Sequence, residues 1–184
     1  MRHAGVMCLV FLPSLAAPAR AIEVGLDLEV KPIEASLLGN LQRPGASDSG
    51  FYFDAGSGLQ ARADIAFAYL TLDYRHFYAL DLDRILAGAG VRFVLPMEKV
   101  AKWRDAELAV SAQAALLVLT GRPPAGADPA ERQNLIGARA GGTLSLSFDM
   151  GEWFYGGFFF GLGAGYAGSF GFDVSCGGLV GLAI

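Results

Sequence analysis

The chain has 184 residues, the length of one domain, and 53% of them are hydrophobic whereas only 17% are charged. Soluble domains carry roughly a quarter of charged residues, so this composition argues against an ordinary soluble protein. The formal net charge of −4 gives no basic surface of the kind that binds nucleic acid, and no nucleic-acid partner is expected.

The N-terminus predicts a secretory signal peptide over residues 1–21. A short basic start precedes an apolar stretch from Gly5 to Leu15, and Ala19-Arg20-Ala21 has the A-x-A form of a cleavage site. We therefore expect the chain to be exported and residues 22–184 to form the mature domain.

Along the mature chain, apolar side chains alternate with small or polar ones. In the first segment Val24, Leu26 and Leu28 alternate with Gly25 and Asp27, the period of a β-strand with one apolar face. The same alternation recurs along the chain and predicts strands over 22–38, 51–63, 66–75, 84–95, 106–120, 135–148, 153–167 and 172–184. An even number of strands is typical of closed bacterial barrels.

Polar, Gly- or Pro-rich segments separate these strands and fall at two ends of the predicted barrel. The connections over 40–50, 78–83, 121–134 and 168–171 lie at one end, and those near 64, 96–105 and 149–152 lie at the other. The turn near Asp64 contains no Gly or Pro, and Gly56-Ser57-Gly58 is a competing turn site.

Aromatic residues gather at both predicted ends. They are Trp103 and Trp153 at one end, and Phe51, Phe77, Tyr78 and Phe172 at the other. Aromatic side chains are enriched where a membrane-spanning barrel meets water, so we expect these residues at the two membrane–water interfaces.

The inward face of the predicted strands carries charged side chains. We expect the lumen to hold Arg62, Arg75, Arg92, Arg139, Glu29, Asp54, Asp73, Glu107 and Asp173. An eight-stranded barrel is just wide enough inside for side chains, and buried charges need partners, so we expect the charges to pair and plug the lumen. The alternative is a narrow gated channel in which the pairs exchange.

The segment from Trp153 to Phe172 is the most apolar of the mature chain, and one membrane helix is the alternative to two strands. Glycine recurs every second residue at Gly161, Gly163 and Gly165, which favours strands because glycine costs about 1 kcal/mol per helical position. We expect these glycines to face inward and leave room for charges from the opposite wall. The G-x-G-x-x-G match that begins at Gly163 precedes another strand, so no cofactor is predicted.

The chain resembles the small eight-stranded outer-membrane barrels of the OmpA/OmpX type over residues 22–184, in pattern, length, signal peptide and loop asymmetry. The resemblance implies an all-β, transmembrane, antiparallel up-and-down β-barrel in the outer membrane of a Gram-negative bacterium. It further implies a monomer whose partners are outer-membrane lipid and the assembly machinery, with a structural or surface-interaction role. Two alternatives stay open, a hydrophobe-handling barrel and a soluble secreted β-barrel that binds an apolar ligand.

His76 is the only histidine of the predicted mature chain, so no histidine-based metal site is expected. Some outer-membrane enzymes place a Ser/His/carboxylate set on the lipid face, but alternation along Tyr74-Arg75-His76 offers no serine on that face. We therefore expect a protein that is not an enzyme.

Overall fold

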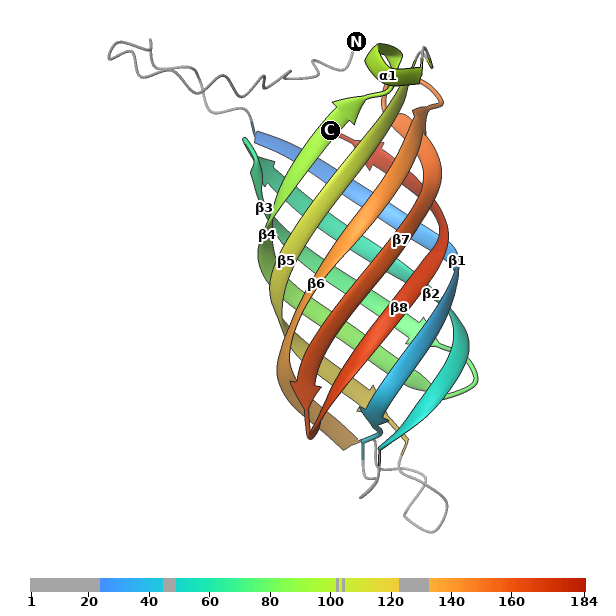
Figure 1. The fold of residues 1–184 in the computed structure, drawn as a ribbon, viewed down its shortest axis with the longest axis vertical. Coiled ribbons are helices and arrows are strands. Elements are labelled where there is room, and N and C mark those ends of the chain that lie inside the picture. Colours follow the sequence, from blue (N-terminus) through green and yellow to red (C-terminus); the bar gives the residue numbers. More distant parts are fainter. Residues whose placement is uncertain (1–23, 45–48, 102, 104, 123–132) are drawn as a thin grey trace, which may run out of the picture.

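The computed structural model describes residues 24–44, 49–101, 103, 105–122 and 133–184, which form a closed antiparallel barrel (Figure 1). The strands are β1 (Val24–Gln42), β2 (Ser49–Ile65), β3 (Ala68–Phe77), β4 (Leu82–Pro96), β5 (Ala106–Gly121), β6 (Gln133–Asp149), β7 (Phe154–Ala167) and β8 (Ser169–Ala183). Each strand pairs with the next, and β8 pairs with β1 to close the barrel. The all-β, antiparallel, up-and-down, eight-stranded barrel expected from the sequence is confirmed, and the predicted signal peptide lies outside the described residues.

The two ends of the barrel differ. The short helix α1 (Glu98–Ala101) lies at the end where β1 begins and where the chain terminates, here called the α1 end (Figure 1). The opposite end, where β1, β3, β5 and β7 finish, is called the distal end. In the part of the chain that the structure describes, no helix is long and apolar enough to cross a bilayer.

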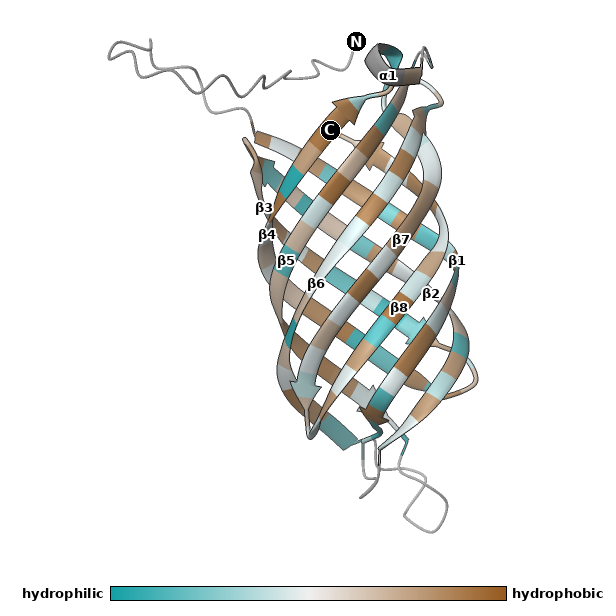
Figure 2. Ribbon diagram, viewed as in Figure 1, coloured by the Kyte–Doolittle hydropathy of each residue, from teal (hydrophilic) through white to brown (hydrophobic). Residues whose placement is uncertain are grey.

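Apolar side chains face outward along the strands. Leu70 and Leu72 of β3 are 57% and 55% exposed, whereas Thr71 and Asp73 are buried. Figure 2 shows apolar and polar residues interspersed along the strands. Closure pairs every strand on both sides, and an apolar exterior over a fully paired backbone is what hydrocarbon requires.

The boundary between β2 and β3 falls later than the competing turn site. β2 runs to Ile65, and the turn that follows includes Ala66 with a φ of 56°. Gly56 and Gly58 lie within β2, where a Cβ would overlap backbone oxygens of β3. These two glycines therefore permit close strand approach and do not make a turn.

The C-terminal apolar segment forms two strands, so the helix alternative is wrong. β7 and β8 pair from Phe154 with Leu182 to Ala167 with Ser169. They are joined at Gly168, whose φ of 76° favours glycine. The G-x-G-x-x-G match thus spans a strand and a hairpin turn.

β1 contains a bulge at Pro32 and Ile33. Lys31 pairs with Gly58 and Glu34 pairs with Gly56, so two residues of β1 lie opposite one residue of β2. Proline is tolerated here because a bulged residue need not donate an N–H to the ladder. The extra residue shifts the alternation, so that Lys31 before the bulge and Glu34 after it are both buried in the lumen.

Apolar side chains fill the barrel interior at the distal end. This distal plug consists of Leu38, Phe77, Leu80, Leu82, Leu86, Ala115, Leu117, Leu119 and Ala167. Phe77 is only 1% exposed, so its predicted place at a membrane interface is wrong. It follows Asp73 and Arg75 at a spacing of two along β3, and the strand therefore directs its ring into the lumen.

Candidate functional site

Charged side chains occupy the lumen between the α1 end and the distal plug. Three groups can be distinguished: the α1-end group (Arg62, Asp27, Glu29, Asp64), the central group (Lys31, Arg75, Asp73, Glu34) and the deep group (Arg84, Arg139, Asp173). Strand alternation, shifted in β1 by the bulge before Glu34, places them there, because every second residue of a barrel strand faces the interior.

The α1-end group surrounds the guanidinium of Arg62 with carboxylates. Its Nε lies 3.0 Å from Asp64 Oδ2, its Nη1 lies 3.3 Å from Glu29 Oε1, and its Nη2 contacts Asp27. Tyr155 donates its hydroxyl to the same Glu29 oxygen at 2.8 Å. One cation therefore links strands β1 and β2, and the hydroxyl adds β7.

The central group is centred on Asp73. Its carboxylate accepts hydrogen bonds from Lys31 Nζ and Arg75 Nε, both at 2.9 Å, and Arg75 Nη1 also contacts Glu34. The ring of Phe159 lies 5.2 Å from Lys31 Nζ and 5.7 Å from Arg75 Cζ, within cation–π range. These four charged side chains are at most 10% exposed, so they lie deep in the lumen and depend on one another.

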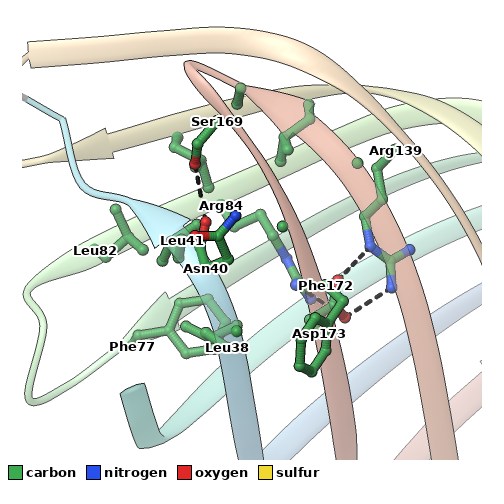
Figure 3. Close-up of a pocket in the computed structure, with 16 residues that line it drawn as sticks. Leu38, Asn40, Leu41, Phe77, Leu82, Arg84, Arg139, Ser169, Phe172 and Asp173 are labelled. Atoms are coloured by element: carbon green, nitrogen blue, oxygen red, sulfur yellow. Dashed lines mark hydrogen bonds and ion pairs between the residues drawn. The ribbon is translucent and has the colours of Figure 1, made fainter. Parts of the chain in front are cut away.

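The deep group joins β4, β6 and β8 (Figure 3). Arg139 donates from Nε and Nη2 to the two oxygens of Asp173 at 2.7 and 2.8 Å, and Arg84 Nη1 lies 3.4 Å from Asp173 Oδ2. A Cβ on Gly163 would overlap the Arg139 guanidinium. The inward glycine thus makes room for an arginine of the adjacent strand β6, and not for a charge of the opposite wall as expected.

Three of the predicted lumenal charges are not members of the three groups. Asp54 is buried, but its oxygens accept N–H bonds from Ala79 and Leu80 at 3.0 and 2.9 Å, so it binds the β3–β4 connection instead of a cation. Arg92 is half-buried and its Nη1 lies 3.8 Å from a carboxylate oxygen of the α1-end group. Glu107 lies near the α1 end of β5 and belongs to none of the three groups.

Five members of the groups were not in the predicted set. Asp27 and Arg84 stand on the inward alternation of their strands, so the sequence held a usable signal for both. Lys31 is inward by the same rule, whereas Glu34 is inward only because of the bulge that precedes it. The sequence predicts a turn near Asp64, but this residue lies in β2.

A separate polar cluster lies on the outward face near the distal end. His76 Nδ1 lies 2.8 Å from Asp83 Oδ1, and Tyr74 donates its hydroxyl to the same oxygen at 2.9 Å. Ser57 of β2 pairs with His76 in register, so the expectation that no serine shares this face is wrong. Alternation along one strand cannot detect a neighbour supplied by the next strand. In the structure no hydrogen bond joins the side chains of Ser57 and His76.

The remaining predicted interface aromatics are exposed at the two ends. Trp103 and Trp153 lie at the α1 end and are 50% and 51% exposed. Phe51, Tyr78 and Phe172 are exposed toward the distal end, and the rings of Phe51 and Phe172 meet edge to face at 6.0 Å.

Two small cavities lie inside the barrel. One, of about 40 Å³, is polar and is lined by residues of the α1-end and central groups. The other, also about 40 Å³, lies between the deep group and the distal plug and is largely apolar (Figure 3). Each has room for a few water molecules. Among the described residues, no cluster of three or more His, Cys, Asp or Glu could hold a metal ion.

No protein-family profile matches the chain, and no curated protein matches it significantly. Among solved structures, the barrel is similar to Neisserial surface protein A (NspA), with a TM-score of 0.62 and 9% identity over 86% of this chain and 96% of that one. The N-terminal β-barrel domain of Pseudomonas aeruginosa OprF matches with a TM-score of 0.47 and 19% identity over 86% and 97% of the two chains. Ail, the attachment invasion locus protein of Yersinia pestis, matches with a TM-score of 0.46 and 10% identity over 89% and 100%. At this identity, the likeness to NspA shows a shared fold.

Proposed function

We propose that the protein is an integral outer-membrane β-barrel with a closed lumen, a structural or surface-interaction role and no enzymatic activity. The observation that carries this proposal is the filling of the lumen by paired charges behind an apolar plug. Paired charges inside a narrow barrel rigidify its wall and stabilise the closed state, because an ion leaving its partner would remain buried.

The distal plug is the main argument for closure. Phe77, Leu82, Leu86 and Leu119 come from the adjacent strands β3, β4 and β5, are each at most 2% exposed, and pack in one cluster with Leu38 of β1 and Ala167 of β7. An ion crossing this layer would lose its hydration without meeting a compensating charge. Water or ions that passed along the three charged groups would therefore still be stopped by the apolar distal plug.

Single-channel recording in planar bilayers tests closure against the channel alternative. The purified full-length barrel should give no conductance steps at any voltage or pH that leaves it folded. The matched control is Leu82→Ser combined with Leu119→Ser, which makes the plug polar. Reproducible steps from the wild-type barrel would overturn the closed-lumen proposal, and steps from the control alone would support it.

Location in the outer membrane is supported by the apolar exterior. Large apolar side chains such as Ile33, Leu116 and Ile136 are 72%, 65% and 74% exposed, which hydrocarbon would cover. Lipid and the assembly machinery would then be the partners, after cleavage of residues 1–21. The test is fractionation: the protein should require detergent for extraction and migrate differently with and without heating. Recovery from the periplasm without detergent would favour the soluble alternative.

The outward pair of His76 and Asp83 would be the candidate active site if the protein were an enzyme. A serine hydrolase requires the nucleophile to contact the base and needs donors for the oxyanion. Ser57 lies next to His76 but makes no hydrogen bond to it, which supports a structural role at the membrane surface. Incubation with acyl-ester lipids should release no fatty acid; release that Ser57→Ala abolishes would refute the non-enzymatic proposal.

A further inference from the structure

Polar side chains interrupt the apolar outward face of the barrel near its distal end. Ser57, His76 and Asp83 are register partners on the adjacent strands β2, β3 and β4, and they share the outward face. On the α1 side of them, the outward residues Leu59 and Leu72 are 57% and 55% exposed. A polar group that faces lipid without a partner costs free energy, so these polar side chains favour a polar contact from the membrane.

Strand β3 places this polar cluster at the edge of the hydrocarbon layer. The strand has ten residues, Ala68–Phe77, and about 9–11 residues are needed to cross the hydrocarbon at a tilt of about 45°. Its two ends therefore lie near the two boundaries of the layer, and His76 lies at the distal boundary. Tyr78 follows the strand, is exposed, and meets the His76 ring edge to face at 5.4 Å. The cluster thus lies where acyl chains give way to lipid headgroups.

The contact with Asp83 decides which atom His76 presents to the lipid. Asp83 Oδ1 lies 2.8 Å from His76 Nδ1 and also accepts the Tyr74 hydroxyl at 2.9 Å. A carboxylate only accepts hydrogen bonds, so Nδ1 carries the proton of the neutral imidazole and Nε2 keeps its lone pair. In the part of the chain that the structure describes, neither His76 Nε2 nor Ser57 Oγ has a hydrogen-bond partner.

A hydroxyl group complements these two atoms. It can donate its proton to His76 Nε2 and accept the proton of Ser57 Oγ, because the Cβ atoms of such register partners lie about 4.5–5.5 Å apart. A phosphodiester would bring only acceptors close to the Asp83 carboxylate, and a quaternary amine offers neither a donor nor an acceptor. The cluster therefore favours an uncharged headgroup that carries hydroxyl groups.

We propose that Ser57 and His76 bind a hydroxyl group of a lipid headgroup in the leaflet at the distal end. The hydroxyl donates to His76 Nε2 and accepts from Ser57 Oγ, while the acyl chain lies over Leu59 and Leu72 and the headgroup lies against Tyr78. Sugar and glycerol headgroups both carry such hydroxyl groups. This site rests on the membrane location proposed above and adds a class of lipid that the barrel wall selects.

The imidazole nitrogen signals of His76 provide the test. The chain has two histidines, so NMR of the full barrel with isotope-labelled histidine gives few signals, and His76→Gln identifies the relevant one. Dodecylphosphocholine micelles in alkaline buffer serve as a host without hydroxyl groups. Titration with dodecyl glucoside or with glycerol monododecyl ether should move the Nε2 signal saturably to lower frequency, with Nδ1 protonated throughout. The dimethyl ether of glycerol monododecyl ether keeps the chain and the oxygens but has no O–H, and it should give no such shift.

Variants locate the contact. Ser57→Ala removes one of the two hydrogen bonds and should raise the amphiphile concentration at half-saturation about threefold or more. Thr120→Val is the matched control, because Thr120 lies in the same outward row on β5 but its hydroxyl already donates to Asn134 Oδ1 at 2.7 Å. This control should leave the titration unchanged. Heat-modifiable migration checks the folding of each variant.

The two amphiphiles distinguish the sources of the hydroxyl. A shift with dodecyl glucoside alone would identify a sugar headgroup, a shift with the glycerol ether alone would identify a glycerol headgroup, and shifts with both would support the shared hydroxyl contact. No saturable shift with either would overturn the proposal and leave water as the partner of both atoms. A shift with the dimethyl ether, or an unchanged titration of Ser57→Ala, would overturn it as well. These results are obtained in detergent and do not depend on where the protein resides, which fractionation tests separately.

Discussion

Replacing Gly163 by alanine should destabilise the barrel by disrupting the ion pair between Arg139 of β6 and Asp173 of β8. The added Cβ would overlap Nη2, Cζ and Nε of Arg139, the atoms that hold Asp173. The methyl group projects into the lumen from β7, where ladders on both sides hold the backbone, so the guanidinium must move. A single methyl group on β7 therefore disrupts an ion pair between its two neighbouring strands, β6 and β8.

Two opposing contributions set the change in the free energy of unfolding that we expect for Gly163→Ala. Removing one partner of a buried ion pair costs about 3–5 kcal/mol, and we take the lower end because a flexible arginine keeps part of the contact. A Gly-to-Ala change alone stabilises by about 0.4–1 kcal/mol through the unfolded chain. The net expectation is that Gly163→Ala lowers the free energy of unfolding by about 2 kcal/mol.

Gly178 in the adjacent strand β8 provides the matched control. A Cβ there would meet only Gly157 O, at 3.9 Å, so Gly178→Ala should be neutral or slightly stabilising. The assay is reversible urea unfolding of the barrel in detergent or lipid vesicles, followed by tryptophan fluorescence.

A double variant provides a second test of the contact between Gly163 and Arg139. In an Asp173→Asn background, Gly163→Ala should cost little, because the ion pair it disrupts is already lost. Equal stability of Gly163→Ala and Gly178→Ala would refute the assignment of Gly163 as the residue that makes room for Arg139. A full loss retained in the Asp173→Asn background would refute it as well.

Three other predictions use the same preparation. Asp73→Asn leaves two buried cations short of a partner and should lower the free energy of unfolding by about 3 kcal/mol or more. Asp64 is more exposed, so Asp64→Asn should lower the free energy of unfolding by less. A larger loss for Asp64→Asn than for Asp73→Asn would contradict the central position of Asp73. Phe77→Ala should lower the free energy of unfolding by about 3–5 kcal/mol, because it opens a cavity in the distal plug. Phe51→Ala on the exterior should lower it by less in the same urea titration. Equal losses would mean that the plug is loosely packed. Bromine atoms near the lipid headgroup should quench both tryptophans more than bromine at the acyl-chain end, and the opposite result would remove them from the interface.

Much of the barrel could be predicted from local alternation. Along the strands, the period of two separates an apolar outward face from a polar or glycine-rich inward face. This alternation predicts the strand positions to within a few residues. The apolar exterior can be predicted without knowing the strand register, because it depends only on which side chains of each strand face outward. Alternation within single strands likewise directs Arg62, Arg75, Arg139 and Asp173 inward, and these side chains are buried in the structure.

Contacts between strands could not be predicted in this way. Ser57 lies next to His76, and Gly163 next to Arg139, because register brings residues of neighbouring strands together. Phe77 was assigned to an interface because it is aromatic and near a strand end, although its own alternation directs it inward.

Alternation within single strands is enough to predict the class of the fold, the apolar exterior and most of the charged interior. Which of the charges meet depends on how the strands pair in the folded barrel. The bulge at Pro32 reverses the alternation of β1 and brings Glu34 to Arg75, and barrel closure brings Arg84, Arg139 and Asp173 together from three strands. The physical reason is that side-chain direction is local to a strand, whereas pairing depends on register, bulges and closure.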